Sequence, residues 1–219
     1  MQIASFLEHE LTRATVTLAE LTLVARNAAD LGIAAICVPP LLVKNARSLI
    51  GDGSIRLSTV VGFPYGYSAI EAKLAEVVLA VVDGADELNM VINLVALKNN
   101  DWQYLAKEIN SILPVLRSKQ RSIKVILETA SLTREEIITC CDLYGAAGVD
   151  FIQLSTGINE EPVPKETITL VRKHLAENVG IKVTSGMLTG MEAQWYIDAG
   201  ATRLGCNNTN ELVNVYSKG

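Results

Sequence analysis

The stretch Gly148-Val-Asp-Phe-Ile-Gln-Leu-Ser-Thr-Gly157 predicts a short buried strand that ends in small and hydroxyl-bearing residues. Ile181-Lys-Val-Thr-Ser-Gly186 has the same form about one strand-helix unit later. An apolar run that ends in serine, threonine and glycine is typical of a parallel strand whose carboxyl end opens onto a site for a phosphate-sized anion. We therefore expect the functional site at the ends of these two strands.

Strand and helix patterns alternate along the whole sequence. The expected strands cover residues 6–11, 33–38, 56–61, 86–92, 122–128, 150–154, 181–184 and 202–205. The expected helices run from Thr15 or Thr17 to Gly32, over 68–82, 101–116, 133–145, 164–175 and 190–197, and from Thr209 onward. No Asn-Gly hairpin signal interrupts the alternation, and no Gly-x-Gly-x-x-Gly turn follows the first strand, as an open nucleotide-binding sheet would favour. Eight strand-helix units predict one (β/α)₈ TIM barrel domain over residues 1–219.

Composition limits the classes of function. With 49% hydrophobic and 20% charged residues among 219, the chain can bury one large core. The net charge of −5 and the scattered lysines and arginines give no footprint for nucleic acid. No leader pattern or uncharged apolar stretch of bilayer length is present, so we expect a cytoplasmic protein without membrane contact. The four cysteines and two histidines show no metal-ligand spacing and no disulfide framework.

Several longer blocks carry a resemblance to a known family. They are Val60-Val-Gly-Phe-Pro-Tyr-Gly66, Gly84-Ala-Asp-Glu-Leu-Asn-Met-Val-Ile-Asn-Leu-Val-Ala-Leu-Lys98, Lys124-Val-Ile-Leu-Glu-Thr129 and Ser155-Thr-Gly157. In this order they resemble the signature blocks of deoxyribose-phosphate aldolases. The resemblance implies a class I aldolase that reversibly cleaves 2-deoxyribose 5-phosphate to acetaldehyde and glyceraldehyde 3-phosphate. It implies a lysine on strand six that forms a Schiff base, a second lysine on strand seven, an aspartate on strand four, and neither cofactor nor metal.

Some family positions are retained and the reacting ones are not. Lys182 matches the strand-seven lysine, Glu128 closes strand five, and Cys37 lies in the strand-two block. Gln153 stands where the Schiff-base lysine is expected, and Asn89 stands where the aspartate is expected. An amide nitrogen is not a nucleophile at neutral pH, and asparagine cannot accept a proton as aspartate does. Aldolase activity is therefore predicted to be lost or strongly reduced.

The expected phosphate site is also altered. Its candidate residues are Thr156, Gly157, Ser185, Gly186, Gly205 and Asn207. After Gly157 the chain continues with Glu160 and Glu161 instead of a glycine-rich turn, which removes close backbone N–H groups and adds negative charge. We expect weak binding of a sugar phosphate.

Two hypotheses remain open at this point. In one, the chain is a non-catalytic descendant that keeps the barrel and a weak ligand site. In the other, it is a working lyase in which Lys182 has become the reacting amine. The alternative for Lys182 is a salt bridge to Glu128 or Glu8, and the alternatives for Cys37 and His9 are packing and structural roles. A homo-oligomer is compatible with the sequence, which does not decide the oligomeric state.

Overall fold

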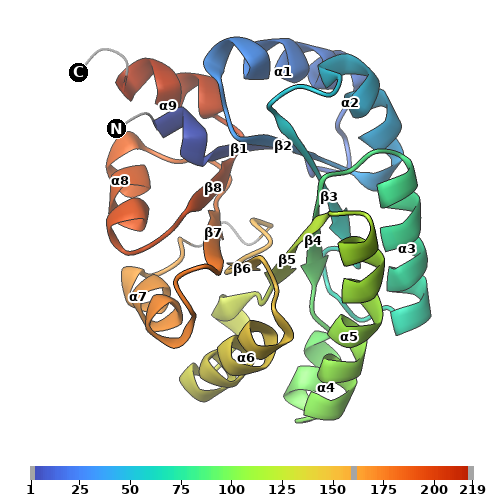
Figure 1. Ribbon diagram of the computed structural model, residues 1–219. Coiled ribbons are helices and arrows are strands. Elements are labelled where there is room, and N and C mark those ends of the chain that lie inside the picture. Colours follow the sequence, from blue (N-terminus) through green and yellow to red (C-terminus); the bar gives the residue numbers. More distant parts are fainter. Residues whose placement is uncertain (1–2, 159–161, 217–219) are drawn as a thin grey trace.

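Eight strands form the inner ring of the protein in a computed structural model that describes residues 3–158 and 162–216 (Figure 1). They are β1 (Leu7–Glu10), β2 (Ala35–Val38), β3 (Arg56–Val61), β4 (Glu87–Val91), β5 (Ser122–Ile126), β6 (Phe151–Gln153), β7 (Gly180–Thr184) and β8 (Arg203–Cys206). Each strand pairs in parallel with the next, and β1 also pairs with β8, where Glu8 lies opposite Gly205. The ring is therefore closed, which confirms the predicted barrel.

Helices surround this ring on its outer side (Figure 1). They are α1 (Leu18–Leu31), α2 (Val43–Ile50), α3 (Ile70–Val82), α4 (Leu94–Lys98), α5 (Trp102–Ser118), α6 (Arg134–Ala147), α7 (Lys165–His174), α8 (Gly190–Asp198) and α9 (Thr209–Tyr216). Short 3₁₀ turns are η1 (Ile3–Phe6), η2 (Pro40–Leu42) and η3 (Thr129–Ser131). Within the described ranges, no helix is long and apolar enough to cross a membrane.

Local sequence signals fix where several helices begin and end. Thr17 and Thr133 each form a capping box, in which the threonine oxygen accepts from the third helical N–H and the glutamate there accepts from the threonine N–H. Gly32 ends α1 in the left-handed conformation at φ 64°, where a side chain would be strained. These signals place the helices close to their predicted ranges.

Two helices were not predicted. α2 follows Pro39 and Pro40 and buries only Val43 and Ala46, so its apolar pattern is too sparse to indicate a helix. α4 begins directly after Asn93, whose side chain caps it by accepting from the Ala96 N–H at 3.0 Å. Its apolar residues continue the run of β4, and so the sequence alone does not separate the two elements.

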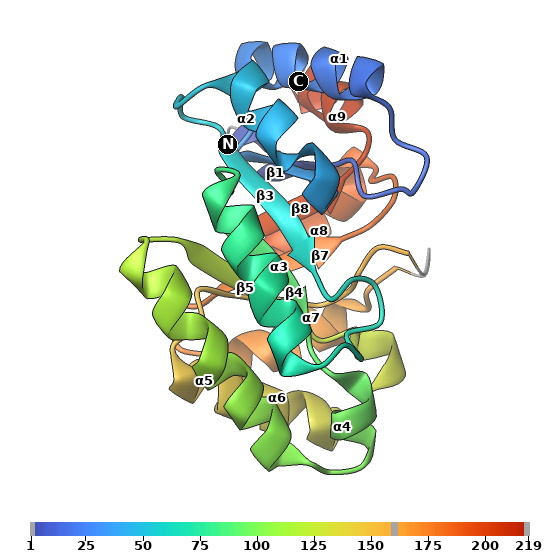
Figure 2. The same ribbon diagram turned by 90° about the vertical axis from the view of Figure 1, so that its right-hand side faces the viewer.

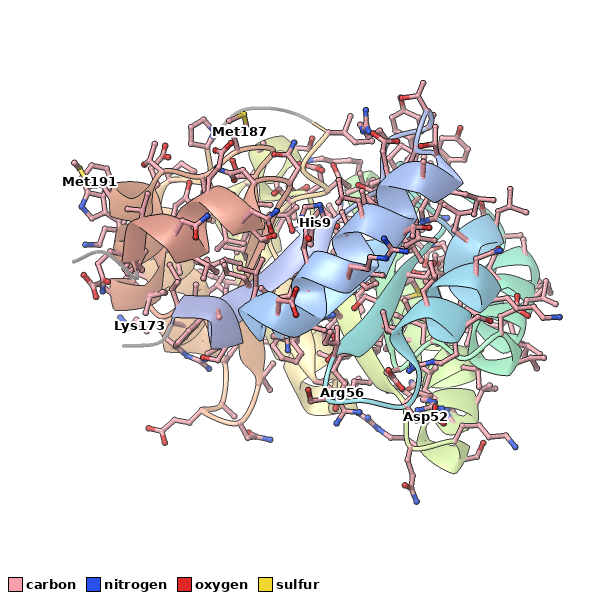
Figure 3. All side chains as sticks on the ribbon, turned by 90° about the horizontal axis from the view of Figure 1, so that it is seen from above. His9, Asp52, Arg56, Lys173, Met187 and Met191 are labelled. Carbon is pink, nitrogen blue, oxygen red and sulfur yellow. The ribbon has the colours of Figure 1, made fainter. Side chains whose placement is uncertain are left out.

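The two ends of the barrel differ in the residues that they carry (Figure 3). Asp52 and Arg56 lie at the end where the strands begin, and Met187 lies in the loop that follows β7 at the opposite end. In parallel barrels the carboxyl ends of the strands bear the functional loops. The residues expected to hold a phosphate end or follow β6, β7 and β8, and so they lie at this second end.

Candidate active site

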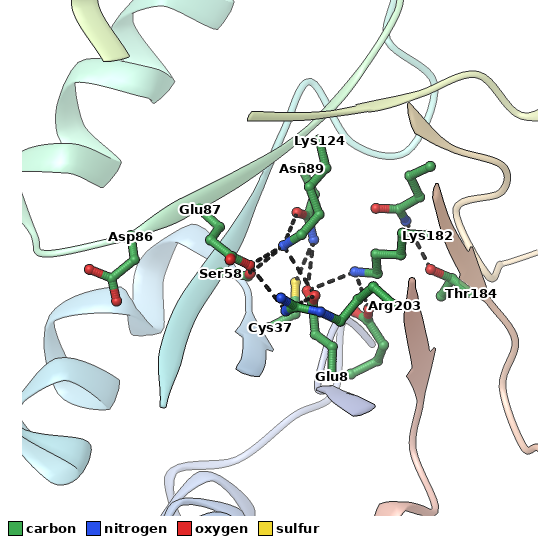
Figure 4. Close-up of polar contacts among 12 residues, drawn as sticks. Glu8, Cys37, Ser58, Asp86, Glu87, Asn89, Lys124, Lys182, Thr184 and Arg203 are labelled. Atoms are coloured by element: carbon green, nitrogen blue, oxygen red, sulfur yellow. Dashed lines mark hydrogen bonds and ion pairs between the residues drawn. The ribbon is translucent and has the colours of Figure 1, made fainter. Parts of the chain in front are cut away.

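Glu8, on β1, is the centre of a buried group of charged side chains inside the barrel (Figure 4). Its Oε1 lies 2.7 Å from Nζ of Lys182 on β7, and its Oε2 lies 3.1 Å from Nζ of Lys124 on β5. Nη1 of Arg203 on β8 is 3.4 Å from Oε2. Burial alone would raise the pKa of the Glu8 carboxyl, but the three cations outweigh it and hold that pKa well below its usual value. Glu8 is therefore ionised and joins β1 to β5, β7 and β8.

Glu87, on β4, completes the group on the other side. Its carboxylate pairs with Lys124, accepts from Oγ of Ser58 at 3.1 Å, and lies 3.4 Å from Nη1 of Arg203. We call Glu8, Glu10, Glu87, Lys124, Lys182 and Arg203 the charged cluster. Its three carboxylates face three cations, and such a balance is what makes burial of these charges tolerable in a low-dielectric interior.

Asn89 uses both ends of its amide within this cluster. Its Nδ2 donates to Oε1 of Glu8 at 3.2 Å and to Sγ of Cys37 at 3.3 Å, while its Oδ1 accepts from Nζ of Lys124 at 3.2 Å. A carboxylate at this position would place two anionic oxygens against each other beside Glu8. The amide therefore suits the ionised Glu8, and the position cannot act as a general base.

Gln153, at the end of β6, lies opposite Lys182 in the β6–β7 register. Its Nε2 donates to the carbonyl oxygen of Ser155 at 2.9 Å and to Oγ1 of Thr184 at 3.0 Å. Its Oε1 is buried and has no hydrogen-bond partner among the described residues. The side chain is thus held as a structural donor where the aldolase mechanism would need an amine.

Lys182 is fully buried and clamped between two carboxylates. Its Nζ lies 2.7 Å from Oε1 of Glu8 and 2.7 Å from Oε1 of Glu10. Burial lowers the pKa of the Lys182 ammonium, but Glu10 and Glu8 outweigh it and raise that pKa above its ordinary value. The predicted salt bridge to Glu8 is confirmed, and Glu10 is a second partner that the sequence reasoning missed.

Glu128 is not the partner of Lys182 that the alternative prediction allowed. Its Oε2 instead accepts from the backbone N–H of Thr156 at 2.9 Å and from the Thr156 hydroxyl at 2.5 Å. Glu128 has a left-handed backbone with φ 54°, which is uncommon for a residue with a side chain. This turn at the end of β5 directs the carboxylate to the β6 loop, and so Glu128 positions Thr156.

The thiol of Cys37 and the imidazole of His9 are poorly suited to nucleophilic or acid-base work. Burial, reinforced by Glu10, raises the pKa of the Cys37 thiol well above its usual value. Burial raises the pKa of Cys206 to about 12. Burial also lowers the pKa of His9 to about 4, and Nδ1 of His9 hydrogen-bonds with Oγ1 of Thr209 at 2.7 Å. These groups are neutral at pH 7 and support packing or structural roles.

A cavity of about 1240 Å³ opens at the carboxyl ends of the strands. Its lining includes five of the six residues predicted to hold a phosphate: Thr156, Gly157, Ser185, Gly186 and Asn207. The sixth, Gly205, lies instead against the charged cluster, because a Cβ there would come within 2.5 Å of Oε1 of Glu10 and 3.0 Å of Cε of Lys182. Glu160 and Glu161, predicted to weaken anion binding, lie outside the described residues.

The reacting positions lie beneath the floor of this cavity. Glu10 and Thr184 are among the lining residues of the described chain, whereas Lys182, Gln153 and Asn89 are not. Thr184 also accepts from Gln153, and Glu10 pairs with Lys182. Glu10 and Thr184 are therefore the lining residues that contact Lys182 and Gln153 directly.

A metal ion fits this interior poorly. Glu8, Glu10 and Cys37 bring possible ligand atoms within 4.8 Å of one another. However, the Lys182 ammonium already pairs with both carboxylates, and the Cys37 thiol stays protonated, whereas a metal requires a thiolate. The donor set suits an ammonium group.

Comparisons with known proteins agree with the barrel and its sequence blocks. Residues 5–201 match the sequence profile of the DeoC/LacD family aldolases. The chain is 36% identical over 219 residues to the deoxyribose-phosphate aldolase of Thermoanaerobacter sp. (strain X514), covering 100% of this chain and 98% of that one. The solved structure of the aldolase QR15 is similar with a TM-score of 0.91 at 29% identity, covering 99% of this chain and 96% of that chain. The tetrameric deoxyribose phosphate aldolase from Aeropyrum pernix has a TM-score of 0.88 at 24% identity, covers 98% of this chain and 91% of that chain, and bears on the fold alone.

Proposed function

Since this chain belongs to the DeoC/LacD aldolase family, we propose that it keeps the family barrel and a sugar-phosphate cavity but has lost the Schiff-base reaction. The single observation that carries this proposal is the state of Gln153. Its amide replaces the amine, and its nitrogen is held by Ser155 and Thr184. Class I aldol chemistry requires a nucleophilic amine at the reacting carbon, which an amide does not supply.

The surroundings of Lys182 argue against the second hypothesis, in which this lysine replaces the lost amine. An amine must lose its proton before it attacks a carbonyl. Glu8 and Glu10 stabilise the ammonium, and their effect on its pKa outweighs that of burial. The two carboxylates therefore keep Lys182 as an ammonium that balances their charge, and an ammonium does not react with a carbonyl.

Asn89 supports the same conclusion from a separate position. Its amide donates to Glu8 and accepts from Lys124, and it has no proton-accepting oxygen of the carboxylate kind. A missing nucleophile and a missing acid-base group each reduce the rate by on the order of 10² or more. Both losses act on the same reacting centre.

The ligand in this proposal is a sugar phosphate held weakly in the cytosol. Gly157, Ser185, Gly186 and Asn207 line one side of the cavity. The backbone N–H groups of Ser185 and Asn207 already donate to the carbonyl oxygens of Gly205 and Gly186, so among these four residues the N–H groups of Gly157 and Gly186 suit an anion. Arg13, from the loop after β1, also lines the cavity but is paired with Glu20, and no arginine or lysine of the described β6–β8 loops joins it, so affinity should be modest. The four cysteines are buried and unpaired, as is usual in a reducing compartment.

The deciding experiment is cleavage of 2-deoxyribose 5-phosphate, with glyceraldehyde 3-phosphate measured by a coupled assay and an active family aldolase run in parallel. We expect turnover at least about a thousandfold slower than that of the active enzyme. Turnover within tenfold would refute the loss of chemistry. Calorimetry with the same compound should give a dissociation constant in the millimolar range, on the order of 4 kcal/mol of binding free energy. Micromolar affinity would contradict the weak site.

A further inference from the structure

Glu10, the last residue of β1, lies at the floor of the cavity. Figure 2 shows the loops that follow β1, β3 and β6 on one side of the barrel, at the right of this view, and the cavity opens among them. The side chain of Glu10 is only 10% exposed. Arg13 and Glu20 also line the cavity, but they form an ion pair with each other, and their side chains are 56% and 41% exposed. Glu10 is therefore deep enough to meet a bound ligand, whereas the Arg13–Glu20 pair lies at the rim.

The two oxygens of the Glu10 carboxylate have different surroundings. Oε1 lies 2.7 Å from Nζ of Lys182, and this ion pair holds the carboxylate in place and favours its ionised form. No described residue hydrogen-bonds to Oε2, so this oxygen can accept a proton from a ligand. Burial raises the pKa of the Glu10 carboxyl above its ordinary value, although the Lys182 ammonium offsets part of this effect. Glu10 is thus a stronger base than an exposed carboxylate.

Thr184, in the last position of β7, supplies a hydroxyl group beside Glu10. Its Oγ1 accepts from Nε2 of Gln153 at 3.0 Å, and no described residue accepts the proton of this hydroxyl. A Cβ on Gly205 would lie 2.9 Å from Oγ1 of Thr184 and 2.5 Å from Oε1 of Glu10, so the two side chains border the same small space. A hydroxyl that accepts a hydrogen bond donates a stronger one in turn. Gln153 therefore prepares the Thr184 hydroxyl as a donor to a ligand.

Two further titratable side chains of the described lining are less suited to removing a proton. Nδ1 of His9 is hydrogen-bonded with Oγ1 of Thr209, and burial lowers the pKa of the imidazole to about 4, which makes it a weak base. Tyr65 is 59% exposed and lies at the rim. The position and the surroundings of Glu10 therefore favour it as the base of this cavity.

A carboxylate beside a hydroxyl donor matches the requirements for removing a proton next to a carbonyl group. The base takes the proton from carbon, and the donor stabilises the oxygen on which negative charge develops. We propose that Glu10 and Thr184 catalyse the reversible enolisation of open-chain sugar phosphates that carry a hydrogen on the carbon next to the carbonyl, without a Schiff base. This inference rests on the sugar-phosphate cavity of the proposed function and adds a reaction to it.

The step can be written for 2-deoxyribose 5-phosphate in its aldehyde form. A C2–H bond breaks, its electron pair forms a double bond between C1 and C2, and the π pair of the carbonyl moves onto the oxygen. Oε2 of Glu10 takes the proton, and the Thr184 hydroxyl donates to the enolate oxygen. Negative charge thus moves from Glu10 to the ligand and remains close to the Lys182 ammonium. The reverse step returns a proton to C2, so nothing is oxidised or reduced, and in D₂O the returned proton is replaced by deuterium.

The test is deuterium exchange at C2 of 2-deoxyribose 5-phosphate in D₂O near neutral pD, followed by proton NMR with buffer alone in parallel. A general base contributes a factor of about 10² or more, so the unaltered protein should exchange C2 hydrogen at least about a hundredfold faster than buffer. Glu10→Gln should return the rate to that of buffer. Thr184→Val, which removes the hydroxyl donor, should slow exchange by at least about tenfold.

Glu177→Gln is the matched control, because it makes the same chemical change on the exposed loop after α7, and its exchange rate should stay within about twofold of that of the unaltered chain. Glu10→Asp keeps the carboxylate but shortens its reach, and it should exchange more slowly than the unaltered chain and faster than Glu10→Gln. Circular dichroism establishes that each variant is folded.

Three outcomes would overturn the inference: exchange at the buffer rate in the unaltered protein, an unchanged rate in the folded Glu10→Gln variant, or loss of exchange after treatment with acetaldehyde and borohydride, which would indicate an imine. The proposed function fails by different measurements. Release of glyceraldehyde 3-phosphate in the same samples at a rate within tenfold of an active aldolase would refute the loss of aldol chemistry, and it would not by itself account for exchange that depends on Glu10.

Discussion

Lys182 should not be trapped as a Schiff base by acetaldehyde and borohydride at pH 7. The carboxylates of Glu8 and Glu10 raise the pKa of its ammonium above the ordinary value in spite of complete burial. Even an ordinary lysine, with a pKa of about 10.4, is a free amine in only about 4 × 10⁻⁴ of molecules at pH 7, which corresponds to about 4.6 kcal/mol. The fraction at Lys182 is smaller still, because the two carboxylates favour the ammonium.

The matched control is Gln153→Lys, which places an amine at the end of β6 opposite Lys182 in the register. The carbonyl oxygen of Ser155 and Oγ1 of Thr184, which accept from Gln153, can also accept from the new Nζ. The neighbouring Lys182 ammonium should lower the pKa of this amine, because a like charge disfavours the protonated form. We expect one ethyl adduct per chain in this variant and, by peptide mapping, its location at position 153.

Peptide mapping of the unaltered protein, treated side by side, gives the decisive comparison, because it distinguishes Lys182 from the exposed lysines, which also react. A stoichiometric adduct on Lys182 would refute the electrostatic reasoning and favour the hypothesis of a working lyase. An adduct on neither lysine in the Gln153→Lys variant would also refute it, because the barrier would then be access to the interior.

Three further predictions concern the stability of the buried interior. Glu8→Gln should lower the free energy of unfolding by about 3–5 kcal/mol in urea denaturation, since it leaves Lys124, Lys182 and Arg203 with one carboxylate fewer. The control Glu177→Gln, on the exposed loop after α7, should have a free energy of unfolding within ~0.5 kcal/mol of the unaltered chain. Asn89→Asp should cost about 1–3 kcal/mol at pH 7, because it removes a donor to Glu8 and faces it with a like charge, and a loss that does not diminish as the pH is lowered would contradict this cause. His9 has a folded pKa of about 4 and an ordinary value of 6.5, so its contribution to stability is present above pH 6.5 and is lost as the pH falls toward 4. Between pH 7 and pH 5 the unaltered protein should lose about 2 kcal/mol of its free energy of unfolding through protonation of His9, and the variant His9→Asn should not show this loss. If both proteins lose the same amount, His9 is not its source.

The barrel itself was predictable because its signals are local. Apolar runs of strand length alternate with capped helices, and the capping boxes at Thr17 and Thr133 lie where the sequence places them. α4 escaped prediction since its apolar residues continue those of β4, and only the Asn93 cap separates them. α2 escaped because two buried residues are too few to establish a period.

The only site residues that could be predicted from the sequence are those that match a position in the family blocks. Gln153, Asn89 and Lys182 were identified from the family blocks, whereas Glu10, Glu87, Lys124 and Arg203 were not. Their signal is present in hindsight, since charged residues inside short apolar strands must face the interior or its ends. Which carboxylate meets which cation depends on the register of strands far apart in the chain, and no local pattern contains that information.

The distribution of the charged cluster along the chain has a consequence for synthesis. Glu8 and Glu10 leave the ribosome first, while Lys182 and Arg203, which neutralise them, leave it last. Until then, placing β1 in a dry interior would bury carboxylates that lack most of their cations, which is costly. The first strand should therefore stay hydrated during translation, and the seam between β1 and β8 should be the last to close. Pulsed hydrogen exchange on stalled chains should show protection of the β1 amides arising only when residues 180–206 have emerged.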